Sequence, residues 1–401
     1  MILPYATDQQ THRRPYAILV LIGLQAILLP LVYMVSGITK MPVSRLFMYI
    51  GIVPANFHLY SLLTYMFLQA GFIHLLLNMF FLWVFGAGVE DAIGSLRTIL
   101  LFIICGITGG LLQDAITIRL LDSRIAMEPI LGSSAACAGL IGLYAVRYYR
   151  ARISFTLIPV KPHVVTVVSL FLLYEMSSGL WAILTGRQQD GVAHWAHVGG
   201  FVCGLVIAHL MGLSRLGQSA YMKQDAESAM ESTRPGAAMK RWAHVLQHDP
   251  SNLEARKQLA LCWFMLGDTD QASTLLGQNV SSCMEAGNRL EAARCLCELL
   301  SRHLPLPKLS TEWKYMLGCA LEEIEESSYA AEFLKEMVLN AEVSIEAENG
   351  ILKAASIYVY KLDQPEAALS LLDLFDKRFP KSTWSIHAAE LRKACQNKSQ
   401  Q

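Results

Sequence analysis

Charged residues are scarce in the first half of this 401-residue chain. Residues 1–215 hold only 21 of the 66 Asp, Glu, Lys and Arg side chains, although they make up more than half of the length. This composition excludes a disordered chain and indicates a lipid-embedded first half and a water-exposed second half. The net charges of the two parts are +5 and −5. Neither part therefore carries the strongly basic field that nucleic-acid binding requires.

Cysteine pairs with metal-binding or redox spacing are also absent. The nine cysteines include no C-x-x-C pair, which argues against a zinc site and a disulfide framework. Six of them lie after residue 215, and free thiols suit a reducing cytosol. The sequence contains no phosphate-binding loop or cofactor fingerprint, and the histidines of the second half have no ligand spacing. We therefore expect no cofactor and no metal.

Apolar stretches long enough to cross a bilayer occur six times in the first half. A hydrocarbon core of about 30 Å requires roughly 20 apolar residues of helix. The first stretch has no small-residue cleavage site after it and is interpreted as a retained anchor. The predicted spans are residues 15–39, a helix from near Gly71 to residue 89, and residues 98–113, 129–146, 162–186 and 191–214. The sequence predicts an all-α fold that begins with a six-helix transmembrane bundle.

Lys and Arg in the short loops indicate the orientation of these spans. With a cytoplasmic N-terminus, the inside segments hold eight such residues and the outside loops five. We expect an integral, multi-pass membrane protein with both termini in the cytoplasm. Its placement in a plasma membrane assumes a bacterial source.

Polar residues within the apolar spans form a pattern. His74 and Asn78 are four residues apart and share one helical face. Ser134 and His197 lie near the starts of the fourth and sixth spans. Because the second, fourth and sixth spans begin on the same side of the membrane, we expect these four side chains at a similar depth near the outer face. Polar groups at such a depth are costly and usually mark function.

These side chains match the needs of serine hydrolysis. A hydroxyl is a weak nucleophile until a nearby base takes its proton, and donors must then stabilise an oxyanion. Ser134 would sit at a helix N-terminus, where free backbone N–H groups add to that stabilisation. His194 lies three residues before His197 and is an alternative base. The non-catalytic alternatives are a small serine that permits helix packing and a buried, hydrogen-bonded histidine.

Four motifs in order resemble the rhomboid family of intramembrane serine proteases across about residues 15–215. They are His74-x-x-x-Asn78, Gly86-x-x-x-Glu90-x-x-x-Gly94, Gly132-x-Ser134 and Ala196-His197-x-x-Gly200-x-x-x-Gly204. The resemblance implies a Ser134–His197 dyad without a third acid. It implies that His74 and Asn78 help to hold the oxyanion beside the Ser134 N–H. It also implies cleavage of transmembrane or juxtamembrane segments of other membrane proteins.

The remaining motif residues have structural interpretations. Gly200 and Gly204 are spaced for close backbone approach, and we expect the sixth helix to pack there on the fourth. Gly132 selects Ser134 rather than Ser133 as the nucleophile of the motif. Glu90 lies about 24 Å along its helix from His74 and is predicted to be a structural anchor.

The chain departs from the rhomboid pattern at three positions. Ala135 follows the nucleophile where the family has glycine, and its methyl group could crowd the site. Ala138 stands where some relatives place an aromatic ring against the catalytic histidine, so the orientation of His197 must come from elsewhere. Gln69 replaces a frequent histidine and is expected to affect packing more than chemistry. We assign no catalytic role to Glu175, the acidic residue within the fifth span, which could be a satisfied polar contact or a neutral carboxyl.

The second half is predicted to be a helical-repeat domain. After the membrane domain (residues 1–215), residues 216–240 are interpreted as a polar linker that is partly helical. Residues 241–401 are predicted to form an α-solenoid of about four hairpins, because the pattern from Leu259 to Ala272 resembles a tetratricopeptide repeat. Such hairpins form a binding surface and carry no chemistry of their own, so we expect a cytosolic protein partner. Self-association or stabilisation of the C-terminus is the alternative.

Three functions are considered. The first is an active intramembrane serine endopeptidase whose partners are transmembrane protein substrates and the lipid bilayer. The second is a catalytically inactive rhomboid-like scaffold that binds transmembrane clients, favoured by Ala135 and Ala138. The third, a transporter or channel, is disfavoured because no inverted repeat and no ring of acidic residues is visible.

Overall fold

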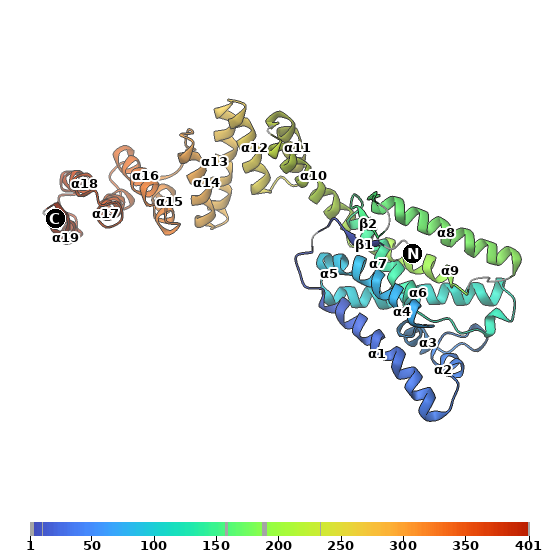
Figure 1. The fold of residues 1–401 in the computed structure, drawn as a ribbon. Coiled ribbons are helices and arrows are strands. Elements are labelled where there is room, and N and C mark those ends of the chain that lie inside the picture. Colours follow the sequence, from blue (N-terminus) through green and yellow to red (C-terminus); the bar gives the residue numbers. More distant parts are fainter. Residues whose placement is uncertain (1–3, 10, 157–158, 187–190, 233, 400–401) are drawn as a thin grey trace. The chain divides into compact units, whose positions relative to one another are not determined.

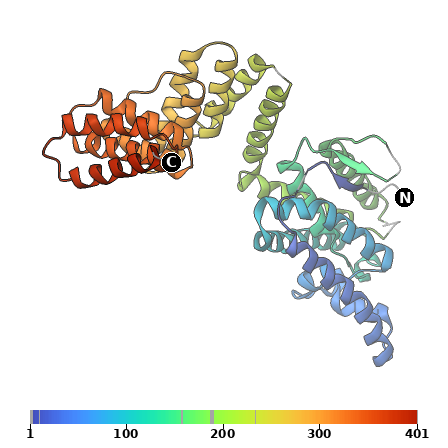
Figure 2. The same cartoon turned by 60° about the vertical axis from the view of Figure 1, so that its left-hand side comes forward.

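The computed structural model describes residues 4–9, 11–156, 159–186, 191–232 and 234–399, and it is mostly helical (Figures 1 and 2). The chain divides into two compact units, Met1–Gln218 and Ser219–Gln401. The all-α prediction is confirmed, apart from one small sheet in the first unit.

Each of the six predicted spans corresponds to helix in the first unit. The first two spans are α1 (Tyr16–Thr39) and the helix that begins with α4 (Phe72–Phe81). α4 continues through a π-helical turn, η3 (Leu82–Gly86), into α5 (Ala87–Ile93). The other four spans are α6 (Ser95–Leu120), α7 (Ser134–Arg147), α8 (Val164–Thr185) and α9 (His194–Leu210). Four spans are long and apolar enough to cross a membrane by themselves, namely Tyr16–Thr39, Phe72–Ile93, Ser95–Leu120 and Val164–Thr185. α7 and α9 are shorter, with 14 and 17 residues.

Short elements connect these helices. They are α2 (Val43–Ile50), η1 (Pro54–Asn56), α3 (Ser61–Thr64), η2 (Tyr65–Phe67) and η4 (Ile125–Met127). Strands β1 (Pro4–Thr7) and β2 (Ile153–Phe155) pair antiparallel. The sequence analysis did not predict this sheet, because strands of three or four residues that are far apart in the chain produce no local periodicity. The pairing places the N-terminal segment beside the connection between α7 and α8.

α7 lies at the centre of the membrane unit, and all residues from Ala135 to Ala145 are buried (Figure 1). The predicted close packing of α9 on α7 is confirmed. A methyl group at Gly200 would overlap the carbonyl oxygen of Ala135, and one at Gly204 would overlap that of Gly139. Backbone therefore meets backbone along this interface, which only residues without a side chain allow.

Glu90 connects α5 to the start of α1. Its carboxylate accepts hydrogen bonds from the backbone N–H groups of Ala17 and Ile18, both at 2.9 Å, and from the Ser95 hydroxyl at 2.6 Å. Because the first N–H groups of a helix have no partner within it, this buried carboxylate caps α1 and offsets the positive end of its dipole.

The second unit is a series of helices in which each packs on the next along the chain. Its elements are the greater part of α10 (Leu213–Glu231), then α11 (Pro235–His248), α12 (Leu253–Met265), α13 (Thr269–Glu285), α14 (Arg289–Ser301), α15 (Thr311–Glu323), α16 (Ser327–Asn340), α17 (Ile345–Tyr360), α18 (Pro365–Arg378) and α19 (Ser385–Ser399). Asn252, Asp268 and Asn288 cap α12, α13 and α14 with their side chains. The helical-repeat prediction is confirmed in its architecture.

The segment expected to be a linker is almost entirely helical. Residues 216–240 lie mostly in α10 and α11, and Ala226, Ala229, Ala238 and Trp242 form a buried cluster with residues of α12. The polar composition made this segment resemble a linker, because its alanines contribute little apolar surface to the sequence pattern. Their small side chains nevertheless allow close helix packing.

Candidate active site

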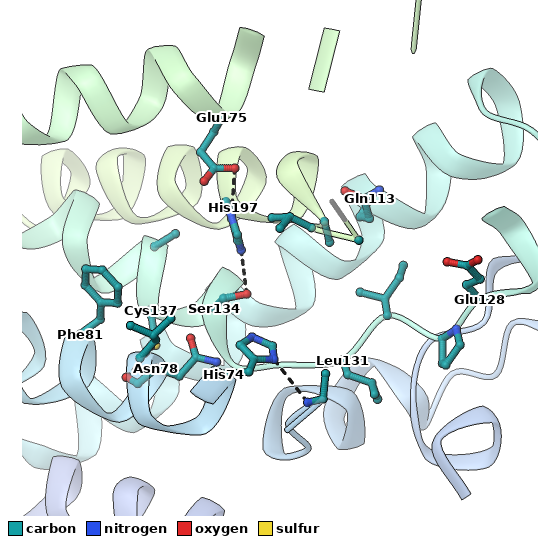
Figure 3. Close-up of a pocket in the computed structure, with 18 of the residues that line it drawn as sticks. His74, Asn78, Phe81, Gln113, Glu128, Leu131, Ser134, Cys137, Glu175 and His197 are labelled. Carbon is teal, nitrogen blue, oxygen red and sulfur yellow. Dashed lines mark hydrogen bonds and ion pairs between the residues drawn. The ribbon is translucent and has the colours of Figure 1, made fainter. Parts of the chain in front are cut away.

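Ser134 is the first residue of α7, and its hydroxyl meets the ring of His197 on α9. The distance from His197 Nε2 to Ser134 Oγ is 2.7 Å (Figure 3). His197 is in the first turn of α9, three residues before Gly200. The close contact between α7 and α9 thus fixes the separation of the two side chains. A hydroxyl and an imidazole nitrogen at this distance have the geometry of a nucleophile and its base.

His74 and Asn78 lie next to the turn that precedes Ser134. The backbone N–H of Ala70 donates to His74 Nδ1 at 3.3 Å, so the neutral ring carries its proton on Nε2. Gly132 has a φ of +119°, and a Cβ there would lie 2.6 Å from His74 Cε1 and 2.9 Å from His74 Nε2. Glycine at 132 is therefore required both by the backbone and by the histidine beside it.

The amide of Asn78 is held by a buried polar network. Asn78 Nδ2 donates to Gln69 Oε1 at 2.7 Å. Gln69 Nε2 donates in turn to Gln25 Oε1 at 2.7 Å and to the Ser133 hydroxyl at 3.2 Å. Gln69 was expected to affect packing more than chemistry, and the structure adds that this side chain sets which way the Asn78 amide points. One N–H of Asn78 remains for the cavity.

A cavity of about 470 Å³ brings the four predicted residues together. Its lining includes His74, Asn78, Ser134 and His197, with Gln113, Phe171 and Glu175 (Figure 3). Ser133, the neighbour of Ser134, is fully buried and accepts a hydrogen bond from Gln69. Such a concave site with convergent polar groups can bind a peptide segment and admit water.

The methyl group of Ala135 is directed into the protein. The residue is 1% exposed, and a Cβ added at Gly109 on α6 would lie 2.8 Å from the Ala135 Cβ. Ala135 therefore fills space between α7 and α6, and the expected crowding of the site by its methyl group is not found. Ala138 does line the cavity, where a larger side chain would have reduced the space.

Gln113 on α6 fixes the beginning of α9. Its Oε1 accepts hydrogen bonds from the backbone N–H groups of Trp195 at 3.0 Å and Ala196 at 3.2 Å. Gln113 Nε2 donates to Thr117 Oγ1 at 3.1 Å. This buried amide replaces a local cap and anchors the turn that carries His197.

The far side of the His197 ring faces α8. Glu175 Oε2 is 3.0 Å from His197 Nδ1 and 2.7 Å from His194 Nδ1. The contact with His194 has the alignment of a hydrogen bond, whereas that with His197 is close but bent. Phe171, one turn before Glu175, packs against His197 with ring centroids 6.3 Å apart. His194, the alternative base, is engaged by Glu175 and does not contact Ser134.

Sequence reasoning did not single out Gln113, and for Gln69 and Glu175 it did not identify the partners. Gln69, Gln113 and Glu175 are buried polar residues in apolar surroundings, at 1%, 2% and 3% exposure. Their presence inside apolar spans was a signal that each has a partner, because an unpaired polar group at that depth is costly. The identity of each partner depended on helix packing, which the sequence pattern did not reveal.

The geometry and the apolar helices define a multi-pass integral membrane protein with a helical-repeat region. Comparison with known proteins is consistent with this class. Residues 56–214 match the family model of the rhomboid domain, and residues 229–278 match that of a tetratricopeptide repeat. These two matches, to a rhomboid domain and then to a tetratricopeptide repeat, follow one another along the chain in the order that the sequence motifs indicated. The repeat match begins within the segment that we expected to be a linker.

One curated relative is a plant protein. RHOMBOID-like protein 4 of Arabidopsis thaliana is 32% identical over 152 residues. The aligned part is 38% of this chain and 34% of that protein, so the match spans about a third of the relative's length. A bacterial source, assumed from the sequence, receives no support from this comparison.

Proposed function

We propose that the protein is an intramembrane serine endopeptidase in which Ser134 is the nucleophile and His197 the general base. The observation that carries the proposal is the 2.7 Å contact between Ser134 Oγ and His197 Nε2 inside a cavity. A serine that served only for helix packing would not need an imidazole nitrogen at its hydroxyl. The rhomboid domain match supports the same class of chemistry.

The reaction follows from the placement of the groups. Ser134 Oγ attacks the scissile carbonyl carbon while its proton moves to His197 Nε2. The resulting oxyanion is stabilised by the Ser134 backbone N–H at the start of α7, by His74 Nε2–H and by Asn78 Nδ2–H. His197 then gives its proton to the leaving amine, which departs and leaves an acyl ester on Ser134. Water activated by His197 hydrolyses that ester and regenerates the serine.

The substrate class is peptide segments of membrane proteins, because the cavity is lined in part by helices that are long and apolar enough to span a membrane. The cavity is lined by the N-terminal ends of α4, α7 and α9, which parity places on one side of the bilayer. β1 pairs with β2, which lies in the connection between α7 and α8. This pairing supports placing the N-terminus on the same side of the bilayer as that connection, opposite to the cavity. With the excess of Lys and Arg there, that side is the cytoplasm, and scission occurs near the outer face.

The helical repeats act as an adaptor for a cytosolic protein. Stacked helices expose an extended surface without chemistry of its own, which suits recruitment of a substrate or a regulator. The match to a tetratricopeptide repeat supports this part of the proposal.

An activity assay tests the proposal. Detergent-purified parent protein, Ser134→Ala and His197→Ala are each incubated with a serine-directed fluorophosphonate and with a fluorogenic transmembrane peptide. We expect labelling and cleavage by the parent, no labelling of Ser134→Ala, and loss of cleavage in both variants. Equal turnover in all three proteins would refute the assignment of these residues. A folded parent that neither reacts nor cleaves would instead support the inactive scaffold.

A further inference from the structure

Glu175 is a buried carboxyl group whose cost must be offset. It is 3% exposed and lies in the middle of α8, a 22-residue helix with otherwise apolar or small polar side chains. An isolated buried carboxylate loses several kcal/mol of solvation unless charged or hydrogen-bonding partners replace the water. In the described structure the partners of Glu175 are two ring nitrogens, His194 Nδ1 and His197 Nδ1.

The role of the contact between His197 and Glu175 depends on which ring nitrogen of His197 carries the proton. In the proposed function the Ser134 hydroxyl donates to His197 Nε2, which requires a neutral His197 to carry its own proton on Nδ1. Glu175 Oε2 lies 3.0 Å from that nitrogen, in a contact too bent for a hydrogen bond, and an ionised carboxylate cannot donate a proton. Its negative charge therefore favours the tautomer that carries the proton on Nδ1 and leaves Nε2 free to act as a base.

α8 also supplies the packing that α7 lacks. Ala138 leaves no aromatic ring on α7 to hold the histidine, whereas Phe171 on α8 lies against the His197 ring. Phe171 and Glu175 are four residues apart and so occupy the same face of α8. One helix thus provides both the apolar and the charged support of His197.

His194 holds the carboxylate in place. Its Nδ1 makes the better-aligned hydrogen bond to Glu175 Oε2, at 2.7 Å, and its ring packs edge-on against Tyr174. Both ring nitrogens lie within 3.0 Å of the same carboxylate oxygen, which leaves no space for a metal ion between them. In the part of the chain that the structure describes, no group of three or more His, Cys, Asp or Glu side chains is arranged to hold a metal ion.

We propose that Glu175 is a positioning residue for His197, so that the site works as a Ser134–His197–Glu175 triad in which His194 anchors the carboxylate. The inference rests on the proposed function. During attack the serine proton moves to His197 Nε2, and the imidazolium then lies beside an ionised carboxylate. Glu175 keeps its charge throughout and takes up no proton. Its attraction to the ring is stronger in the transition state than in the resting enzyme, which lowers the barrier.

The test separates kcat from KM in the full-length protein. Glu175→Gln keeps the shape of the side chain and removes its charge, while Glu175→Asp keeps the charge and retracts it by one methylene. We expect Glu175→Gln to lower kcat by about 100-fold with KM within about threefold of the parent, because the carboxylate does not touch the substrate. The kcat of Glu175→Asp should be at least about tenfold higher than the kcat of Glu175→Gln. Ser177→Ala, an exposed change on the same helix, is the matched control.

Each outcome has one meaning. If the parent neither labels nor cleaves, the proposed function fails, irrespective of Glu175. If the parent is active and Ser134→Ala is silent, a Glu175→Gln kcat within about threefold of the parent overturns the triad. Equal losses in Glu175→Gln and Glu175→Asp, accompanied by lower melting temperatures, would show a purely structural role and also overturn it. Recovery of kcat in Glu175→Asp supports the proposal, since a charge-independent packing role would not favour aspartate over glutamine.

Discussion

Gly200 on α9 lies directly against the carbonyl oxygen of Ala135 on α7, with no room for a methyl group between them. Ala135 follows Ser134, and Gly200 comes three residues after His197. The contact of the two backbones therefore sets how far the hydroxyl is from the imidazole. Helix packing and the geometry of the proposed Ser134–His197 pair therefore depend on the same residue.

Replacing Gly200 with alanine should separate the two side chains. Relief of the overlap requires α9 to move away from α7, and displacements of about 1 Å cost roughly 100-fold in rate at sites of this kind. Gly200→Ala should therefore lose about 100-fold in cleavage rate. Gly37→Ala on α1 is the control, because no heavy atom lies within 4 Å of a Cβ at that position. A Gly200→Ala protein with the parent's cleavage rate would show that this contact does not set the geometry.

The hydrogen bonds of Gln69 should fix the orientation of Asn78, one of the proposed oxyanion donors. Gln69→Leu removes the acceptor of the Asn78 amide and leaves Asn78 free to rotate. We expect kcat to fall about tenfold, less than the loss for a deleted oxyanion donor, because Asn78 itself remains. Gln25→Leu leaves the bond between Gln69 and Asn78 intact and should have a smaller effect on kcat. In the Asn78→Ala background, Gln69→Leu should add little. Full additivity of the two losses would contradict the coupling.

Glu90 should contribute to stability rather than to catalysis. Glu90→Ala leaves the buried N–H groups of Ala17 and Ile18 without their acceptor. Unsatisfied buried donors cost about 1–3 kcal/mol, so the melting temperature in detergent should fall. Asp91→Asn is a milder control, since its bonds to the N–H groups of His12 and Arg13 are exposed. At a temperature where the variant is folded, its kcat should match the parent's, and a selective loss of kcat would contradict the structural role.

The helical repeats contain an ion-pair cluster whose contribution should depend on pH. Partial burial by itself would raise the pKa of Glu298, but Lys257 on α12, with Arg302, outweighs it and lowers that pKa. Since the folded-state pKa is lowered, the stabilisation is fully present above the ordinary glutamate pKa of about 4.3 and is lost as pH falls through the folded value. Glu298→Gln should therefore destabilise α12–α14 at about pH 7, by about 1 kcal/mol or less, and hardly at all at about pH 3.

Hydrogen exchange of the full-length protein measures this difference. Parent and Glu298→Gln are compared at each pH, so that the intrinsic pH dependence of exchange cancels. Glu285→Gln, an exposed change on α13, is the control and should not alter protection in α12–α14. A destabilisation by Glu298→Gln that grows as pH falls would contradict the assigned direction of the pKa.

The sequence predicted the helices of the membrane unit well because their signals are local. An apolar run of about 20 residues, interrupted by few charges, identifies a span without knowledge of its neighbours. The same local pattern placed Ser134 at a helix start and His74 on one face with Asn78. The sequence predicted a partly helical linker at residues 216–240, and the extent of helix there in α10 and α11 was underestimated. It did not predict β1 and β2, whose partners are far apart in the chain.

The sequence by itself determined the helical class, the six apolar segments and the four polar residues that line the cavity, since each depends on composition or on spacing within one helix. Only the tertiary structure decided that Glu175 on α8 faces His197, that Gln69 holds Asn78 and that Gln113 caps α9. Those relationships join different helices, and the rotation of one helix against another is set by the packing of whole interfaces. No short stretch of sequence contains that information.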